Sequence, residues 1–245
     1  MQKYLSLITV PYDSSHFNKR MGAGPLYLIN HGLVQNLQNK GYEVDYTCIR
    51  LEEEFPAEIA TTIKLLHEIK IAVTSAINNN SFPIVLSGNC YATVGVVNGL
   101  NEDKAAVLWF DAHGDCETPE TTVTGFLDGM GLSMLMHCCW ENLLQFNDLR
   151  RRVNGNKVVL VGARDLSISE EEFIKSNHSF QRTGLLLICV NLLNLRTYHR
   201  LIGSILALKE KLGPILFQLP PKWKVNRTRF KEFLEVLTTG YSHAF

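Results

Sequence analysis

Short apolar runs rich in valine, isoleucine and leucine alternate along this chain with longer segments of helical period. Residues 83–86 and 105–110 are continuous apolar runs, as expected for strands that are covered on both faces. Residues 57–78 carry apolar side chains three and four positions apart, which is the period of an amphipathic helix. Strands that alternate with helices in this way form parallel sheets. The pattern therefore predicts a protein of the α/β class.

The same reasoning assigns the remaining elements. Turn residues and apolar periodicity predict further strands and helices whose order continues the alternation. The strands are expected at residues 4–10, 43–48 and 157–161, and the helices at residues 25–39, 129–137 and from 169 onward. In the tail we expect a helix at 201–212, a strand at 215–219 and a helix at 230–237.

Composition excludes several classes of protein. Hydrophobic residues make up 46% of the chain, charged residues 20%, and the formal net charge is zero, so no basic excess favours nucleic acid. The longest uncharged apolar run, 183–195, is shorter than the ~20 residues that span a bilayer. Six cysteines without a CxxC pair, and no signal peptide at the N-terminus, lead us to expect reduced thiols and a cytoplasmic protein without membrane segments.

The residues most suggestive of chemistry are 111–115, Asp-Ala-His-Gly-Asp, directly after the apolar run 105–110. Alternate positions of an extended backbone face one side, so Asp111, His113 and Asp115 can converge beyond the end of a strand. Two carboxylates and an imidazole suit Mn²⁺ or a similar ion, which can lower the pKa of a bound water. On spacing alone, a solvated loop with an Asx-turn fits equally well. Two features favour the metal site: a buried strand precedes the loop, and the loop is longer than an ordinary connection.

Residues 109–130 resemble the DAHxD segment of the arginase, agmatinase and formimidoylglutamase family, and the resemblance extends over residues 1–177. It implies a three-layer α/β/α fold with a mostly parallel sheet and a binuclear Mn²⁺ centre. It also implies hydrolysis of a guanidino or amidino C–N bond in a small molecule by a metal-bridging hydroxide. By analogy with the family, we expect a homo-oligomer.

Carried onto this sequence, the resemblance makes Asp111 the residue that bridges two metals, with Asp115 on one and His113 on the other. Cys90 stands where the family has a histidine ligand. A thiolate favours zinc or softer ions over a manganese pair, and Cys90 fits equally well as a small buried hydrophobic residue.

The substrate positions depart from those of classical arginases. Glu117 and Phe126 stand in place of asparagines and Asp128 in place of a histidine, so arginine specificity is not supported. We assign Glu117 and Thr124 to substrate binding and Asp128 to a catalytic role. The alternative for Asp128 is the N-cap of a helix over residues 129–137.

The second metal motif of the family, which supplies the other bridging carboxylate, has no counterpart, because no aspartate follows Asp165. One bridging carboxylate in place of two removes much of the charge that holds a metal pair together. We therefore expect one metal ion or none, and weak or absent hydrolysis. The alternatives are a relative that binds metal or ligand without hydrolysis, and a protein that retains only the sheet for a structural role.

The tail has a resemblance of its own. Residues 198–245 resemble a helix, strand and helix from an uncharacterised TIM-barrel family, while residues 178–197 match neither family. A piece of this size cannot close a barrel, so it either packs as a last strand and helix on the preceding sheet or hangs loosely. We expect an arginase-like sheet that is incomplete at its C-terminal side, and we hypothesise a truncated or rearranged gene.

Overall fold

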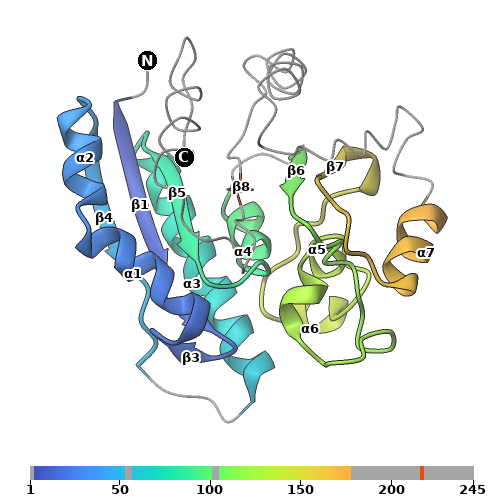
Figure 1. Ribbon diagram of the computed structural model, residues 1–245. Helices are drawn as coiled ribbons and strands as arrows, with labels where there is room; N and C mark the ends of the chain where they lie inside the picture. Colours follow the sequence, from blue (N-terminus) through green and yellow to red (C-terminus); the bar gives the residue numbers. More distant parts are fainter. Residues whose placement is uncertain (1–2, 53–56, 101–104, 178–215, 218–245) are drawn as a thin grey trace.

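A computed structural model describes residues 3–52, 57–100, 105–177 and 216–217 (Figure 1). The expected helices at 201–212 and 230–237, and the segment 178–197, lie outside the described residues. Within the described ranges, no helix is both long and apolar enough to cross a bilayer.

The N-terminal part contains a parallel three-stranded sheet in the order β4-β1-β5. Its strands are β1 (Tyr4–Val10), β4 (Glu43–Cys48) and β5 (Phe82–Ser87). The central strand β1 pairs with both neighbours, with Leu5 opposite Val44 on one side and Phe82 on the other. All three strands lie where the sequence predicts them.

Helices cover both faces of this sheet, because alternate side chains of β1 point in opposite directions. Leu5 and Leu7 pack with apolar residues of α1 (Ala23–Asn30) and α2 (Leu33–Asn39). Ile8 and Val10 pack with those of α3 (Glu58–Asn78), and α4 (Ala92–Gly99) lies against α3. Figure 1 shows α1 and α2 on one side of the strands and α3 on the other. This arrangement confirms the three-layer α/β/α fold.

A second parallel sheet has the order β7-β6-β8. Its strands are β6 (Val107–Phe110), β7 (Val158–Val161) and β8 (Leu216–Phe217). Trp109 pairs with Leu216 and Phe110 with Phe217, so part of the strand expected at 215–219 adds to the preceding sheet. Of the two arrangements considered for the tail, these two residues follow the packed one.

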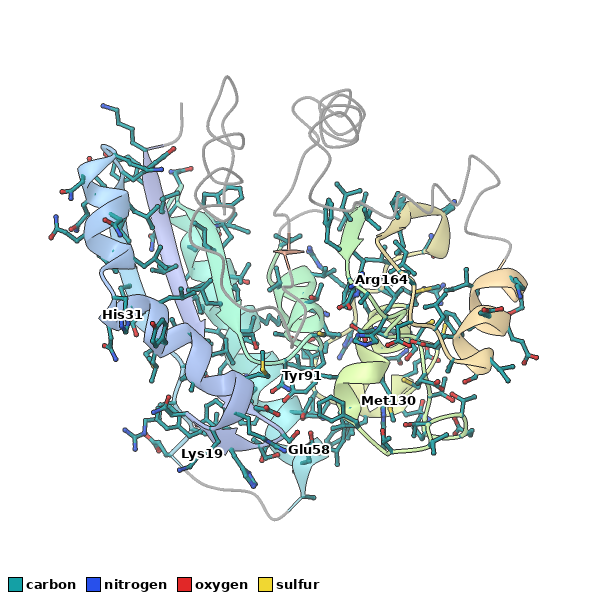
Figure 2. All side chains as sticks on the ribbon, in the orientation of Figure 1. Lys19, His31, Glu58, Tyr91, Met130 and Arg164 are labelled. Atoms are coloured by element: carbon teal, nitrogen blue, oxygen red, sulfur yellow. The ribbon has the colours of Figure 1, made fainter. Side chains whose placement is uncertain are left out.

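The largest apolar core joins β6 to the helices around it. It includes Leu66 of α3, Val94 of α4 and Trp109 of β6, together with Tyr91 and Met130, which Figure 2 labels. Trp109 and Met130 are almost completely buried. This core lies beneath the ends of β5 and β6, so the loops that leave those strands start from a rigid base.

Two helix predictions were wrong in their extent. The helix expected at 25–39 is divided into α1 and α2, because Gly32 adopts φ +85°, a left-handed conformation that ends a helix. The helix expected at 129–137 is a 3₁₀ turn, η2 (Leu127–Met130), followed by the short helix α5 (Gly131–Leu135).

The remaining elements are short. They comprise a hairpin of two strands with two residues each, two 3₁₀ turns and two helices: β2 (Tyr12–Asp13), β3 (His16–Phe17), η1 (Arg20–Gly22), η3 (Gly155–Lys157), α6 (Glu141–Phe146) and α7 (Ile168–Ser176).

Candidate metal site

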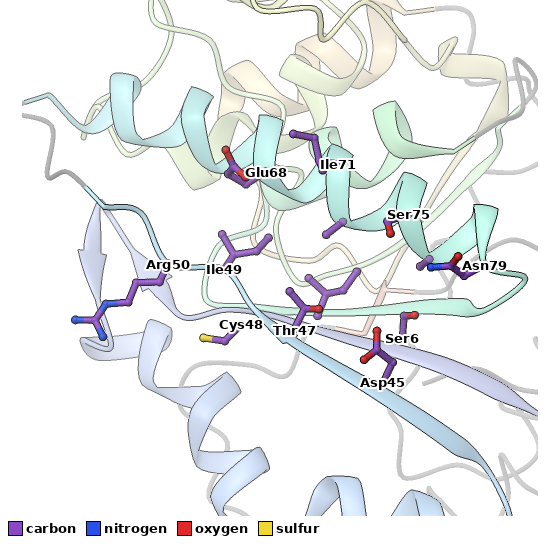
Figure 3. Close-up of a pocket in the computed structure, with 13 residues that line it drawn as sticks. Ser6, Asp45, Thr47, Cys48, Ile49, Arg50, Glu68, Ile71, Ser75 and Asn79 are labelled. Atoms are coloured by element: carbon purple, nitrogen blue, oxygen red, sulfur yellow. The ribbon is translucent and has the colours of Figure 1, made fainter.

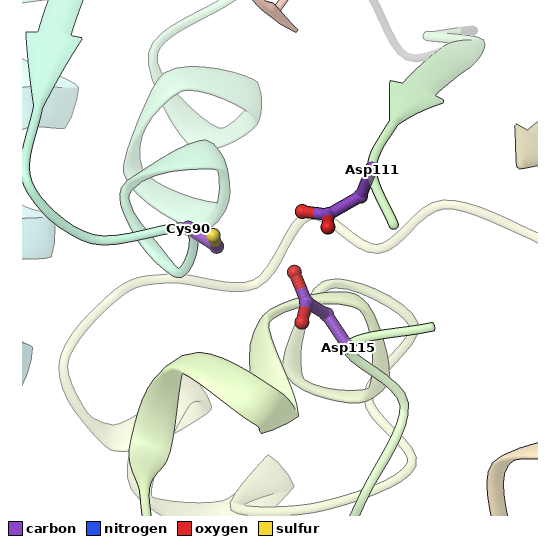
Figure 4. A group of neighbouring side chains, drawn as sticks. All are labelled: Cys90, Asp111 and Asp115. Carbon is purple, nitrogen blue, oxygen red and sulfur yellow. The ribbon is translucent and has the colours of Figure 1, made fainter. Parts of the chain in front are cut away.

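Three potential ligands from different parts of the chain meet beyond the ends of two strands. Cys90 lies in the turn between β5 and α4, Asp111 directly follows β6, and Asp115 lies four residues further along the loop. The Cys90 Sγ and one carboxylate oxygen from each aspartate lie within 4.8 Å of one another. Figure 4 shows the three side chains pointing toward a common centre. Within the described ranges, this is the one group of three or more such ligands that approach so closely.

The backbone around Asp111 and Asp115 is held by hydrogen bonds. The Asp111 N–H donates to the carbonyl of Val161 at 3.0 Å, which continues the β6–β7 ladder by one residue. The Asp111 Oδ1 accepts from the N–H of His113 at 2.9 Å, an Asx-turn of the kind considered from the sequence. The carbonyl of Asp115 accepts from Leu132 at 2.7 Å. These hydrogen bonds therefore fix the loop that carries the carboxylates of Asp111 and Asp115.

Glu170 of α7 holds the same loop from the other side. Its Oε1 accepts from the backbone N–H groups of Gly114 at 3.1 Å and Cys116 at 3.4 Å. Its Oε2 accepts from the N–H of Ser167, which completes a capping box at the start of α7. A Cβ at Gly114 would lie 2.8 Å from Glu170 Oε1, so a larger residue there would displace the Glu170 carboxylate. Glu170 thus ties the metal-ligand loop to α7.

We predict that Glu170→Ala lowers the free energy of unfolding by about 2–3 kcal/mol, since it leaves buried N–H donors unpaired and removes the Glu170 half of the capping box. Metal affinity is expected to fall by about tenfold, because the loop that carries Asp115 loosens. Urea unfolding and metal titration measure the two effects. Glu171→Ala is the matched control, because Glu171 pairs with Lys175 at the exposed surface, where solvent screens the interaction. Equal losses in both variants would contradict the role of Glu170.

Asp128 supports the turn that carries Cys90. Its Oδ1 accepts from the N–H of Cys90 at 2.8 Å and its Oδ2 from the side-chain amide of Asn89 at 2.7 Å. The Tyr91 hydroxyl donates to Asn89 Oδ1 at 2.9 Å. The alternative role of Asp128 as the N-cap of a helix over 129–137 was wrong, because neither η2 nor α5 begins with a side-chain cap. Its carboxylate instead serves the start of α4.

The electrostatic environment of the cluster favours a cation. Burial, together with the nearby charges of Asp111 and Asp128, raises the pKa of Asp115 to about 8. Burial also raises the pKa of Asp128 to about 7, although its hydrogen bonds oppose this, and it raises the pKa of the Cys90 thiol. Asp115 is 4% exposed, and its Oδ2 is buried without a hydrogen-bond partner. A bound cation would supply the missing partner.

His113 lies at the exposed edge of the cluster. Its Nδ1 is 3.2 Å from Asp111 Oδ1, its Nε2 is 3.9 Å from Asp165 Oδ2, and its side chain is 42% exposed. Asp111 and Asp115 converge as the sequence predicts, whereas His113 is not part of the closely spaced group. The role of His113 as a ligand stays a prediction.

The two residues assigned to substrate binding have local partners. The Glu117 carboxylate accepts from the hydroxyls of Ser167, Thr121 and Ser169, the last at 2.8 Å. Burial raises the pKa of Glu117, but these hydrogen bonds outweigh it and hold the pKa below its ordinary value. Thr124 is exposed and its hydroxyl accepts from the N–H of Phe126. Substrate binding by Glu117 and Thr124 stays a prediction.

Sequence reasoning missed the functional contacts of Glu170 and Asn89. Acidic residues in the first turn of α7 suit the helix dipole and by themselves indicate no contact with the loop. The pattern Ser-x-x-Glu at 167–170 signals a capping box and could have singled out Glu170. No sequence pattern indicates that Asn89 donates to Asp128.

A groove of about 350 Å³ lies between β4 and α3 (Figure 3). Asp45, Cys48 and Arg50 line it from the sheet side, and Glu68 and Ser75 from the helix. None of the three clustered ligands borders this groove, so it is separate from the candidate metal site.

The ligand set fits one cation better than a pair. A two-ion centre needs ligands for both ions, including bridging carboxylates, and the cluster has two carboxylates and a thiol. Manganese prefers oxygen and nitrogen ligands, so the buried thiol does not suit it. The described residues therefore do not fit a binuclear manganese centre.

The fold and the site together define a three-layer α/β protein with a cluster of two carboxylates and a thiol at its strand ends. Comparison with known proteins identifies the family. The arginase family model matches residues 3–184. The arginase of Bacillus subtilis (strain 168) is 27% identical over 201 residues, covering 76% of this chain and 68% of that protein. The arginase of Staphylococcus aureus (strain COL) is 36% identical over 189 residues, covering 72% and 62%. This chain belongs to the arginase family.

A solved structure agrees with this assignment. The arginase from Bacillus cereus superposes with a TM-score of 0.69 over 87% of this chain and 73% of that one, at 23% identity, which shows the shared fold. The chain spans about two thirds of the length of the curated relatives. The family match runs to residue 184, into the segment 178–197.

Proposed function

We propose that this protein is an arginase-family metal-binding protein that hydrolyses a guanidino or amidino C–N bond weakly or not at all. The observation that supports this most is the composition of the cluster, in which Cys90, Asp111 and Asp115 converge without a second set of carboxylates among the described residues. A divalent cation held there supplies a water of lowered pKa and a Lewis acid. The described residues offer no ligand set for the second ion, which the family uses to complete this chemistry.

The residues of this chain have separate proposed roles. Asp111 and Asp115 bind the ion, and His113, 3.2 Å from Asp111, is placed to join them or to take up a proton at the exposed side. Glu117 and Thr124, in the loop that follows, are proposed to contact the small-molecule substrate, and Asp128 is proposed to act in catalysis. Metal analysis tests the manganese of the family against the softer ions that the Cys90 thiol favours. A cytoplasmic location and a homo-oligomer are predictions that fractionation and light scattering test.

One observation favours a second candidate, a relative that binds a ligand without hydrolysing it. The described residues bring together ligands for a single ion, which is enough to bind a metal but not the metal pair that the family uses for hydrolysis. Binding of a guanidino compound without product would distinguish this candidate from a slow hydrolase.

The experiment measures metal content and turnover together. Purified protein is loaded with manganese or zinc and incubated with arginine, agmatine and other guanidino and amidino compounds, and urea and formamide are measured. We expect about one equivalent of metal and a turnover below about 1 s⁻¹, the low end of ordinary enzymes. Asp111→Asn is the control that lacks the central ligand.

Two results would contradict the proposal. Close to two equivalents of manganese with turnover in the ordinary enzymatic range would show an intact family site. Less than half an equivalent of either metal at saturation would show that the cluster is not a metal site.

A further inference from the structure

We infer that the cluster of Cys90, Asp111 and Asp115 is built for a single thiophilic cation of the Zn²⁺ class, bound through the Cys90 sulfur. The inference deepens the proposed function and rests on it, because it concerns the same site. It replaces the hard manganese pair of the family with one softer ion. The argument depends on the geometry of the three ligands, on the surroundings of Cys90 and on an unpaired oxygen.

The geometry requires only a small adjustment. Zinc binds sulfur at about 2.3 Å and carboxylate oxygen at about 2.0–2.2 Å, so neighbouring ligands of a tetrahedral ion lie about 3.5 Å apart. The three ligand atoms here are all within 4.8 Å of one another. The remaining adjustment is about 1 Å, which is within the range that rotation of the two carboxylate side chains can supply. His113 or water can occupy the fourth position.

The surroundings of Cys90 distinguish it from an ordinary buried thiol. One side of the residue belongs to the largest apolar core, and its sulfur faces the carboxylates of Asp111 and Asp115. Its backbone is fixed by Asp128. A small hydrophobic residue would need no such fixed position beside two carboxylates. A thiol that is to become a metal ligand needs a fixed position and neighbouring ligands such as these carboxylates.

The unpaired oxygen is an independent observation. Asp115 Oδ2 has no hydrogen-bond partner although Asp115 is only 4% exposed. Leaving a buried carboxylate oxygen unpaired costs free energy, and a cation in the cluster removes this cost. Binding breaks the S–H bond of Cys90 and forms a metal–sulfur bond, and the proton passes to solvent. Affinity is therefore expected to rise with pH.

The test uses the whole 245-residue chain and three metals. Cadmium provides a thiolate-to-metal charge-transfer absorption that reports directly on a metal–sulfur bond, while zinc and manganese are compared by competition. Because most protein sites prefer zinc to manganese, the informative quantity is the change in that preference when the sulfur is removed. We expect Cys90→Ser to lose the cadmium absorption and to lower the zinc-over-manganese preference by at least about tenfold.

Two further variants make the result unambiguous. Cys48→Ser removes an exposed thiol outside the cluster and is expected to leave both readouts unchanged. Cys90→His keeps a ligand at this position and is expected to bind metal without the charge-transfer band. Its metal binding would also show that the fold tolerates changes at residue 90.

The outcomes separate this inference from the proposed function. Metal binding without the cadmium absorption, and with the same metal preference in Cys90→Ser, would overturn the inference and leave the proposed function standing. Failure of the wild-type protein to bind any of the three metals would overturn both.

Discussion

Asp115→Asn is expected to have opposite effects on the metal-free and metal-loaded protein. In a chelator, the variant should unfold at higher denaturant, with the free energy of unfolding raised by about 1–2 kcal/mol. Zinc affinity should fall by at least about 100-fold, because removing a direct ligand costs more than the 10- to 100-fold loss seen for outer-shell partners. A single substitution would then separate stability from function.

The physical reason lies in the crowding of charge at this position. Asp115 is buried beside Asp111 and Asp128, and its Oδ2 lacks a partner. Asparagine has nearly the same shape without the charge, and its amide can donate to the Asp111 carboxylate. The native residue therefore costs stability until a cation arrives, which is the usual relation between a binding site and the stability of its empty form.

The measurement is urea unfolding in chelator and at saturating zinc, combined with metal titration. Asp165→Asn is the matched control, because it makes the same chemical change at a carboxylate whose side chain is 83% exposed. The control should leave stability within about 0.5 kcal/mol of the wild type. A variant Asp115→Asn that is less stable than the wild type in chelator would contradict the proposed crowding.

The sequence predicted the strands well because they are encoded locally. Residues 83–86 and 105–110 are uninterrupted apolar runs, and the strands β5 and β6 fall on them. Helix extents were harder to predict. Gly32 lies inside a stretch with helical periodicity, and whether such a glycine continues or ends a helix depends on packing that local sequence does not show.

The loop that follows β6 shows a different limit. The convergence of Asp111, His113 and Asp115 was argued from an extended backbone, in which alternate side chains share a side. The structure turns instead, with an Asx-turn at Asp111 and φ +48° at Asp115. This turn brings the two aspartates together and leaves His113 at the exposed edge. Alternation predicted the convergence of the two aspartates but assumed a different backbone, and it wrongly placed His113 with them.

Sequence patterns do not indicate which residues far apart in the chain contact one another. The hydrogen bond from Gly114 to Glu170 joins residues 56 positions apart, and that from Asn89 to Asp128 joins residues 39 apart. Cys90 was placed near the aspartates through resemblance to the family alone, since β5 and β6 belong to different sheets of the described chain. The residues that converge were therefore predictable in part, whereas the long-range contacts that hold them in place were not.

Asp128→Ala is expected to lower the free energy of unfolding by about 2–3 kcal/mol and metal affinity by about 10- to 100-fold. The change removes the acceptor for the Cys90 N–H and for the Asn89 amide, leaving two buried donors unpaired. Cys90 would then lose the support that aims its sulfur at the aspartates. Urea unfolding and zinc titration measure the two losses.

Asp128→Asn separates support from a catalytic role. Its side-chain oxygen can still accept from the Cys90 N–H, so it should keep most of the metal affinity that the alanine variant loses. If Asp128 acts in catalysis, as we also proposed, Asp128→Asn should bind metal nearly as the wild type does while any measurable turnover falls sharply. Equal turnover per bound metal in the two proteins would assign Asp128 to positioning Cys90. Wild-type metal affinity in Asp128→Ala would contradict that positioning role.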